Sequence, residues 1–490
     1  MSVVSFPSRL AATTLALFLT TALASAESGK ALFEKMIAGP EGKGSVTYGS
    51  VSEADDGSFS AQGVTLISGR TGQAMQIAAL SVQNMREAGD AVTWDALAMK
   101  DVSFATPKGE AWTVGTLAST QASVPNPTRI GRDRERLLKQ RVRLGTLSIG
   151  GISMSGRDGS AGLQTFTMNN ADIPLRWAFG RPTTPAAALA APMTSDLVRM
   201  EGLSGSARGV QWTLGEVRFD KVNLPTGMSS DLSQWLKLYE TVRVAGLDVK
   251  IGGKTVVSMG EMKGSLKEED GTGRSTGQID TIRIDLKALP NPQAVQMANA
   301  FGYEEIDLSV TADGSYNPTT GRASVDTMDM RLKDMFDASF SYVLQGYTGE
   351  VVQALQEAQA AVARGMNQAE AYGPLMGTLA NLKLERLGLS LTDRSLLGKV
   401  LDFQAAQMGT TGEQLAQGVP MMIGLGMAQL NMPDFTDMVS RAVGTFLRDK
   451  GTLSIEAAPP EPVSVIGLVA TGQADPKRVP LMLNLRVSAQ

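Results

Sequence analysis

One segment, residues 273–277 (Gly-Arg-Ser-Thr-Gly), has the Gly-x-Ser-x-Gly spacing of a nucleophile elbow. In that motif a serine lies at a sharp turn between a strand and a helix, and a histidine takes its proton. The chain contains no histidine, and the segment lies in an acidic, glycine-rich stretch that is followed by a strand-like pattern. We therefore expect residues 273–277 to belong to a hairpin loop and not to a hydrolase site.

The absence of both histidine and cysteine removes several classes of catalytic site. Without these residues there is no Ser-His-Asp or Cys-His site, no thiol nucleophile, and no zinc or haem site of the usual kind. A Ser-x-x-Lys pair, which supports acyl transfer without histidine, does not occur either. Mechanisms based on carboxylates, lysine, tyrosine or bound Mg²⁺ or Ca²⁺ remain open, but no group of residues argues for one. We predict a non-enzymatic protein with no catalytic residue, cofactor or metal site.

Four aspartates provide the hard oxygen ligands that Ca²⁺ prefers: Asp326, Asp329, Asp334 and Asp337. Their spacing lacks the central glycine of a calcium-binding loop. We expect them to lie on a solvated strand face.

A basic run between residues 129 and 143 is the strongest concentration of positive charge. It consists of Arg129, Arg132, Arg134, Arg136, Lys139, Arg141 and Arg143. One interpretation is a contact for an anionic partner, such as lipid or lipopolysaccharide phosphates or an acidic envelope protein. The other is an exposed linker or helix face. Nucleic acid is not expected as a partner, because the formal net charge is −4 and the chain is predicted to be exported.

The C-terminal third is rich in methionine, and residues 419–430 are apolar on almost every side. One interpretation is a buried helix. The other is an adaptable apolar surface for a ligand or partner, because methionine fills irregular contacts well. The side chains that would form this surface are Met421, Met422, Ile423, Leu425 and Met427.

The first residues have the features of a cleavable signal peptide. Arg9 provides the positive charge, residues 10–23 are apolar, and Ala24-Ser25-Ala26 has the small-x-small pattern of a cleavage site. We therefore predict cleavage after Ala26 and export to the periplasm, with no transmembrane helix in the mature chain and at most a peripheral membrane contact. An exported chain without cysteine has no disulfides, so its stability must come from burial.

From about residue 44 to 342, apolar side chains alternate with polar ones, as in Val210/Trp212/Leu214. This pattern is typical of antiparallel sheets with one buried face. We predict a mainly β fold with an α+β C-terminal part: an elongated, curled antiparallel sheet of many hairpins, covered in part by helices. The predicted body spans residues 27–345, with a hinge near 174–192, and the C-terminal region spans 346–490. The expected helices are 28–37, 132–140, 231–241, 292–301, 350–371, 396–408, 412–430 and 435–447, and the expected C-terminal strands are 382–391, 453–455 and 481–487.

A finer regularity is a one-residue slip within this alternation. In residues 142–154 the apolar positions are Val142/Leu144, then Leu147/Ile149, then Ile152/Met154. A slip moves every later side chain to the other face unless a bulge or tight bend absorbs it. We therefore predict long, bulged strands.

These features together resemble those of AsmA-like and YdgA-like envelope proteins of Gram-negative bacteria. The resemblance is carried by the hairpin texture of residues 209–224 and 246–266. It implies a curled sheet with an apolar concave face that is associated with envelope lipids, and it carries over no catalytic residues. AsmA-like proteins usually keep an N-terminal membrane anchor, whereas a cleavable leader is expected here. The predicted function is to bind or handle lipid acyl chains, and the alternative is a periplasmic scaffold or adaptor that acts through protein contacts.

Overall fold

The computed structural model describes residues 28–38, 44–68, 72–106, 109–126, 140–157, 159–175, 192–225, 232–427 and 431–490. The fold is mainly β, with 53% of residues in strands and 27% in helices, as the sequence predicted. Contacts divide the chain into two compact units. Unit 1 comprises residues 1–229 and 238–253, and unit 2 comprises residues 230–237 and 254–490. The main boundary between the units therefore lies near residue 253. The change in composition near residue 346 lies within unit 2 and marks the point after which helices become frequent.

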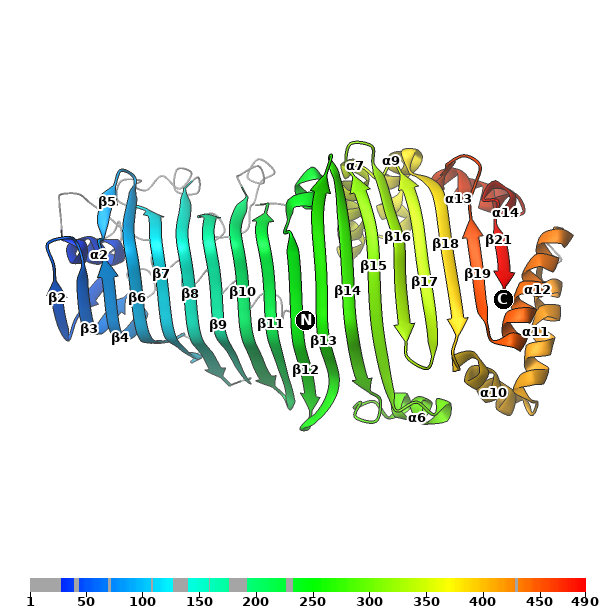
Figure 1. The fold of residues 1–490 in the computed structure, drawn as a ribbon, viewed down its shortest axis with the longest axis horizontal. Helices are drawn as coiled ribbons and strands as arrows, with labels where there is room; N and C mark the ends of the chain where they lie inside the picture. The colour runs from blue at the N-terminus through cyan, green and yellow to red at the C-terminus, as the bar shows by residue number, and fades with distance from the viewer. Residues whose placement is uncertain are drawn as a thin grey trace. The chain divides into compact units, whose positions relative to one another are not determined.

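Unit 1 is an open antiparallel sheet in which most strands pair with their neighbours in sequence (Figure 1). Helix α2 (Gly29–Ala38) precedes the sheet. The strands are β1 (Ser45–Thr47), β2 (Ser50–Glu53), β3 (Phe59–Ile67), β4 (Ala74–Gln83), β5 (Arg86–Ala88), β6 (Ala91–Ala105), β7 (Ala111–Pro125), β8 (Arg141–Gly156), β9 (Gly159–Pro174), β10 (Met193–Ala207), β11 (Val210–Leu224) and β12 (Thr241–Ile251). Both β1 and β2 pair with β3, and β5 pairs with β6 beside β4.

Unit 2 contains the remaining antiparallel strands, β13 to β21, together with most of the helices. Its strands are β13 (Lys254–Glu269), β14 (Thr272–Asp285), β15 (Glu305–Asn317), β16 (Arg322–Leu332), β17 (Phe336–Gln345), β18 (Lys383–Asp393), β19 (Thr452–Ala457), β20 (Val463–Ser464) and β21 (Arg486–Ala489). Its helices are η2 (Leu232–Lys237), α6 (Pro292–Phe301), α7 (Gly349–Ala363), α8 (Gln368–Tyr372), α9 (Leu375–Thr378), η3 (Leu379–Asn381), α10 (Leu396–Met408), α11 (Gly412–Met427), α12 (Pro433–Asp449), α13 (Val465–Ala474) and α14 (Arg478–Met482). Helix α12 packs against β21, the last strand of this sheet, which limits access to the free strand edge.

The two-residue alternation produces an apolar face and an outer face in each unit, because successive side chains in a strand point to opposite sides. In β8, Val142, Leu144, Leu147, Ile149 and Ile152 are all buried, whereas the residues between them are more exposed. We use "apolar face" for the side to which such residues point and "outer face" for the other side.

The predicted slips occur in unit 1, but they are not bulges. Between β7 and β8, Leu117 pairs with Ile149 and Val114 pairs with Ile152, so the register is the same on both sides of Gly115 and Gly151. The alternation of inward and outward side chains is interrupted at the same position in both strands, so that two consecutive residues of each strand point to the outer face. Each slip therefore forms a corner that bends the sheet around its apolar face.

Two rows of such corner residues run across the strands of unit 1. The first row consists of Gly63, Ala78, Asp101, Gly115, Gly151, Gln164, Gly202, Gly215 and Gly246, and the second of Asn84, Asp95, Gln121, Gly145, Asn170, Asp196, Lys221 and Glu240. The rows are six residues apart along each strand, as between positions 115 and 121 or 145 and 151. Every second residue of each row has a positive φ, from 48° at Gln121 to 72° at Gly246. The repeat is thus one strand with two corners.

True register shifts occur in unit 2, outside the segments for which bulges were predicted. The register changes between Ile279 and Ile282 in β14, and again between Asp313 and Gly314 in β15. Further shifts lie between Val325 and Met328 and in the pairing of β17 with β18. Bulges of this kind bend a strand and increase its twist.

Most of the predicted helices are confirmed, with small changes at their ends. Residues 292–301 and 396–408 match α6 and α10, whereas 231–241 forms only the short η2 and 350–371 is divided between α7 and α8. The predicted strand 481–487 is wrong at its start, because α14 extends to Met482 and β21 begins at Arg486. Helix α13 was not predicted. Residues 132–139 and the predicted leader lie outside the described residues. Among the residues that the structure describes, no helix is long and apolar enough to cross a membrane.

Candidate functional site: the apolar faces of the two units

The first half of unit 1 has a buried apolar face. Helix α2 places Leu32, Phe33, Met36 and Ile37 against the sheet, where they are 1–8% exposed. The ring of Phe33 lies 5.6 Å from that of Phe59 on β3. The same buried cluster continues across the strands to Ile173 and Leu175 at the end of β9. This part of the face has the burial of an ordinary protein core.

The apolar face changes character from β10 onward. The side chains remain apolar, but most are only half-buried. They are Met193, Val198, Met200, Leu203, Trp212, Leu214, Val217, Phe219, Leu224, Val242, Val244, Leu247, Val249 and Ile251. On these three strands no charged side chain points to this face. The exposed apolar surface is therefore continuous across β10, β11 and β12.

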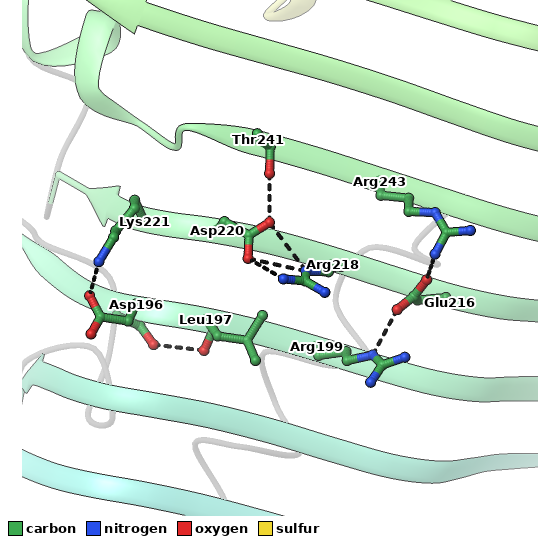
Figure 2. Close-up of polar contacts among 10 residues, drawn as sticks. Asp196, Leu197, Arg199, Glu216, Arg218, Asp220, Lys221, Thr241 and Arg243 are labelled. Atoms are coloured by element: carbon green, nitrogen blue, oxygen red, sulfur yellow. Dashed lines mark hydrogen bonds and ion pairs between the residues drawn. The ribbon is translucent and has the colours of Figure 1, made fainter.

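The charged residues of β10–β12 lie on the outer face, where most of them form ion pairs with one another (Figure 2). Arg199, Arg218 and Arg243 are neighbours across the three strands, an arrangement that would be repulsive without counter-charges. Glu216 lies between two of them. It accepts hydrogen bonds from Arg199 Nε at 2.7 Å and from Arg243 Nη1 at 2.5 Å. Its side chain is only 11% exposed, so these two bonds are its main compensation for lost water.

The third arginine of this row pairs along its own strand. The Arg218 guanidinium binds both carboxylate oxygens of Asp220 at 2.8–3.2 Å, and the Thr241 hydroxyl donates to Asp220 at 2.6 Å. The Arg218 hydrogen bonds, followed by that from Thr241, hold the pKa of Asp220 below its usual range. Near the second corner row, Lys221 binds Asp196 at 2.8 Å, as Figure 2 also shows. The outer face is thus polar and internally paired.

A shallow trench of about 400 Å³ crosses β8–β12 along the first corner row. Its lining residues are Gly151, Ile152, Ser153, Gly162, Leu163, Gln164, Gly202, Leu203, Ser204, Thr213, Leu214, Gly215 and Gly246. Ile152 and Leu163 are buried in the core of the other face. The exposed lining residues, such as Ser153, Gln164 and Thr213, point outward. The trench therefore lies on the outer face, where the corner glycines leave the backbone uncovered.

Unit 2 also carries an incompletely covered apolar face. Aligned apolar residues cross β14–β18, as in the row Ile282, Leu308 and Leu332. Most are half-buried, and two are more open: Met328 is 36% exposed and Leu389 is 42% exposed. Both point to the same side as Phe340, which lies directly opposite each of them. The helices of unit 2 leave this face accessible.

The basic run predicted as an anionic contact is described only in part. Arg129, Arg132, Arg134, Arg136 and Lys139 lie outside the described residues. Arg141 and Arg143 belong to β8 and share one partner, Asp172 of β9, at 2.6 Å and 3.4 Å. Arg141 also donates to the carbonyl oxygen of Pro192 at 2.6 Å. The two arginines therefore link β8 to β9 through Asp172. The side chain of Arg143 nevertheless remains 68% exposed.

The methionine-rich segment forms α11, and its apolar side chains are not buried as a group. Met421, Met422 and Leu425 are 73%, 67% and 70% exposed, whereas Ile423 and Met427 are half-buried. The interpretation as a buried helix is therefore wrong for its most apolar positions. Helix α11 instead packs one side against α12 and leaves the other open.

The remaining sequence candidates do not converge on a site. Residues 273–277 lie within β14, not in a loop, and Ser275 donates weakly to the carbonyl oxygen of Gly314 at 3.5 Å. No helix follows them directly. Asp337 forms ion pairs with Arg331 and Arg394. Among the described residues no three acidic side chains gather in a way that could hold a metal ion.

The outer-face network of β10–β12 was not singled out from the sequence. A signal was present, because Arg199, Glu216, Arg218, Asp220 and Arg243 all occupy the polar positions of alternating strands. Their pairing depends on strand register, which the alternation alone does not specify.

A family model described as an uncharacterized protein matches residues 329–490. This match begins in β16 and covers the rest of unit 2. No curated protein matches the chain.

Proposed function

We propose that this protein binds or handles lipid acyl chains on the apolar faces of its two units, as a non-enzymatic component of the bacterial envelope. The observation that carries the proposal is the change at β10. The apolar face is buried up to β9, and beyond it the same face stays apolar and charge-free but is only half-buried. Large exposed apolar surfaces of this kind typically mark binding sites.

The physical chemistry of the face fits hydrocarbon. An acyl chain needs apolar contact and no hydrogen bonds, and about 25 cal/mol is gained per Å² of apolar surface removed from water. The charges of β10–β12 are directed to the outer face and paired there, as with Glu216 and its two arginines. The signal-peptide pattern and the resemblance to AsmA-like proteins support a periplasmic location.

The test is lipid analysis of the purified protein combined with paired substitutions. Leu214→Arg and Leu389→Arg place a charge on the apolar faces of units 1 and 2. Thr213→Arg is the matched control, because Thr213 is the exposed neighbour that points to the outer face. We expect mass spectrometry after gentle extraction to find bound acyl lipid in the wild type and in Thr213→Arg, and much less in the two leucine variants.

Tryptophan fluorescence should show that each variant remains folded. If the wild-type protein carries no lipid and takes none up from vesicles, the proposal fails. Equal lipid content in Leu214→Arg and Thr213→Arg would show that the apolar face of unit 1 is not the binding surface.

A further inference from the structure

Three of the seven tyrosines gather at one end of the apolar face of unit 2. Tyr316 is near the end of β15 and Tyr342 is near the end of β17, and pairing through β16 places both on the apolar face. Tyr347 follows β17, and its ring packs edge-on against Tyr316 with centroids 6.0 Å apart. The ring of Phe340 lies 5.6 Å from that of Tyr342 and continues the aromatic surface along β17.

The hydroxyl groups of this cluster are not used equally. Tyr316 donates to the carbonyl oxygen of Tyr347 at 2.9 Å, so its role is structural. The hydroxyls of Tyr342 and Tyr347 form no hydrogen bond with any other residue that the structure describes. Burial raises the pKa of Tyr316 to about 12, and burial followed by the proximity of Tyr342 raises the pKa of Tyr347. The phenols of Tyr316 and Tyr347 therefore remain protonated at neutral pH.

The surroundings of the cluster select against charge. On β15–β17 every charged residue, including Asp313 and Arg331, points to the outer face. Near the tyrosines, Arg322 and Glu385 form an ion pair with each other on the outer face. An ionised group on the apolar face would thus lose water without gaining a counter-charge, whereas a neutral ester would find donors.

The dimensions of the face suit one hydrocarbon chain. From Tyr342 back to Phe336, β17 offers Phe340, Ala338 and Phe336 on the apolar side. Six residues of strand span roughly 20 Å. The hydrocarbon of one bilayer leaflet is about 15 Å thick, half of the bilayer core. A chain anchored at the tyrosines would therefore be in contact with apolar side chains along its whole length.

We propose that Tyr342 and Tyr347 bind the neutral polar end of a single-chain acyl ester, with its hydrocarbon lying along β15–β17 toward Phe336. The proposal rests on the proposed acyl-chain function, and adds an orientation and a ligand class. Tyrosine suits such a position because its ring is apolar and its hydroxyl is polar.

The test compares two probes on the full-length chain, using displacement of a fluorescent fatty-chain dye. The probes are a C16 monoacylglycerol and hexadecane delivered from cyclodextrin. The double variant Tyr342→Phe/Tyr347→Phe keeps both rings and removes only the two hydroxyls. Tyr372→Phe is the control, because Tyr372 is an exposed tyrosine on α8 of the same unit. We expect the double variant to bind the monoacylglycerol about tenfold more weakly and to bind hexadecane as the wild type does.

Each outcome separates the two proposals. Unchanged monoacylglycerol binding in the double variant would overturn the tyrosine site and leave acyl-chain binding intact. Tighter binding of ionised C16 fatty acid than of the ester would also overturn it. If the wild type binds neither probe, the proposed function itself fails.

Discussion

The corner rows of unit 1 make a sharp prediction about two glycines that face each other. Gly151 in β8 has a φ of 65°, whereas Gly115, opposite it in β7, does not have a positive φ. A Cβ atom on Gly151 would lie 3.5 Å from the nearest heavy atom, and one on Gly115 would lie 3.4 Å away. Both positions therefore have room for a methyl group, and only the backbone conformation distinguishes Gly151→Ala from Gly115→Ala.

The expected difference follows from backbone energetics. A left-handed conformation costs an alanine about 1–2 kcal/mol. Replacing glycine by alanine also stabilises the folded state by about 0.5–1 kcal/mol, because it lowers the conformational entropy of the unfolded chain. We expect Gly151→Ala to lower the free energy of unfolding of unit 1 by about 1 kcal/mol. Gly115→Ala should raise it by about 0.5–1 kcal/mol.

Urea unfolding followed by tryptophan fluorescence suits this comparison, because Trp94, Trp112 and Trp212 belong to unit 1. With a slope near 3 kcal/mol per molar, a loss of 1 kcal/mol lowers the midpoint by about 0.3 M. Gly151→Asn should lose less, since asparagine tolerates the left-handed region and already occupies it at Asn170. Equal effects of Gly151→Ala and Gly115→Ala would refute the assignment of the corner to backbone conformation.

Three further substitutions test the surface interactions. Glu216→Ala leaves two half-exposed arginines without their shared carboxylate and should cost about 1–2 kcal/mol in urea unfolding; no loss would show that the pairs contribute little. Asp220 has a lowered native pKa, so its stabilisation is present above the unfolded pKa near 4 and is lost as pH falls through the native value. Asp220→Asn should therefore be less stable than wild type at pH 7, and the difference should disappear as the pH falls through the native pKa of Asp220. Met421→Ser should change stability by less than about 0.5 kcal/mol, because Met421 is 73% exposed; a larger loss would mean that it is buried in solution.

The β-rich architecture could be predicted because alternation is a local property. Val142, Leu144, Leu147 and Ile149 specify by their spacing alone which side of β8 is apolar and where the slip lies. The helices 292–301 and 396–408 were equally well marked, the first by Asn291 and Pro292 at its start. The slip itself was misread as a bulge, because a single strand does not reveal whether its partner slips at the same level.

The C-terminal misassignments have a similar cause. Residues 481–487 contain the apolar spacing of a short strand, but Arg478–Met482 continues as a helix after Pro476 and only β21 pairs with β19. The methionines of α11 looked like core because they are apolar on every side. They are exposed because α11 packs mainly against α12 and α10, and these two helices do not cover the methionine side chains.

Composition and periodicity were sufficient to establish that this chain lacks imidazole and thiol chemistry and presents many one-sided strands. These are properties of residue type and spacing, which do not require long-range contacts. Only the tertiary structure decided which stretch of the apolar face is buried and which is left half-exposed from β10 onward. It also decided that Arg199, Glu216 and Arg243 meet, and that Tyr316, Tyr342 and Tyr347 gather at one end. Such contacts join residues that are distant in sequence, and strand register and helix packing bring them together.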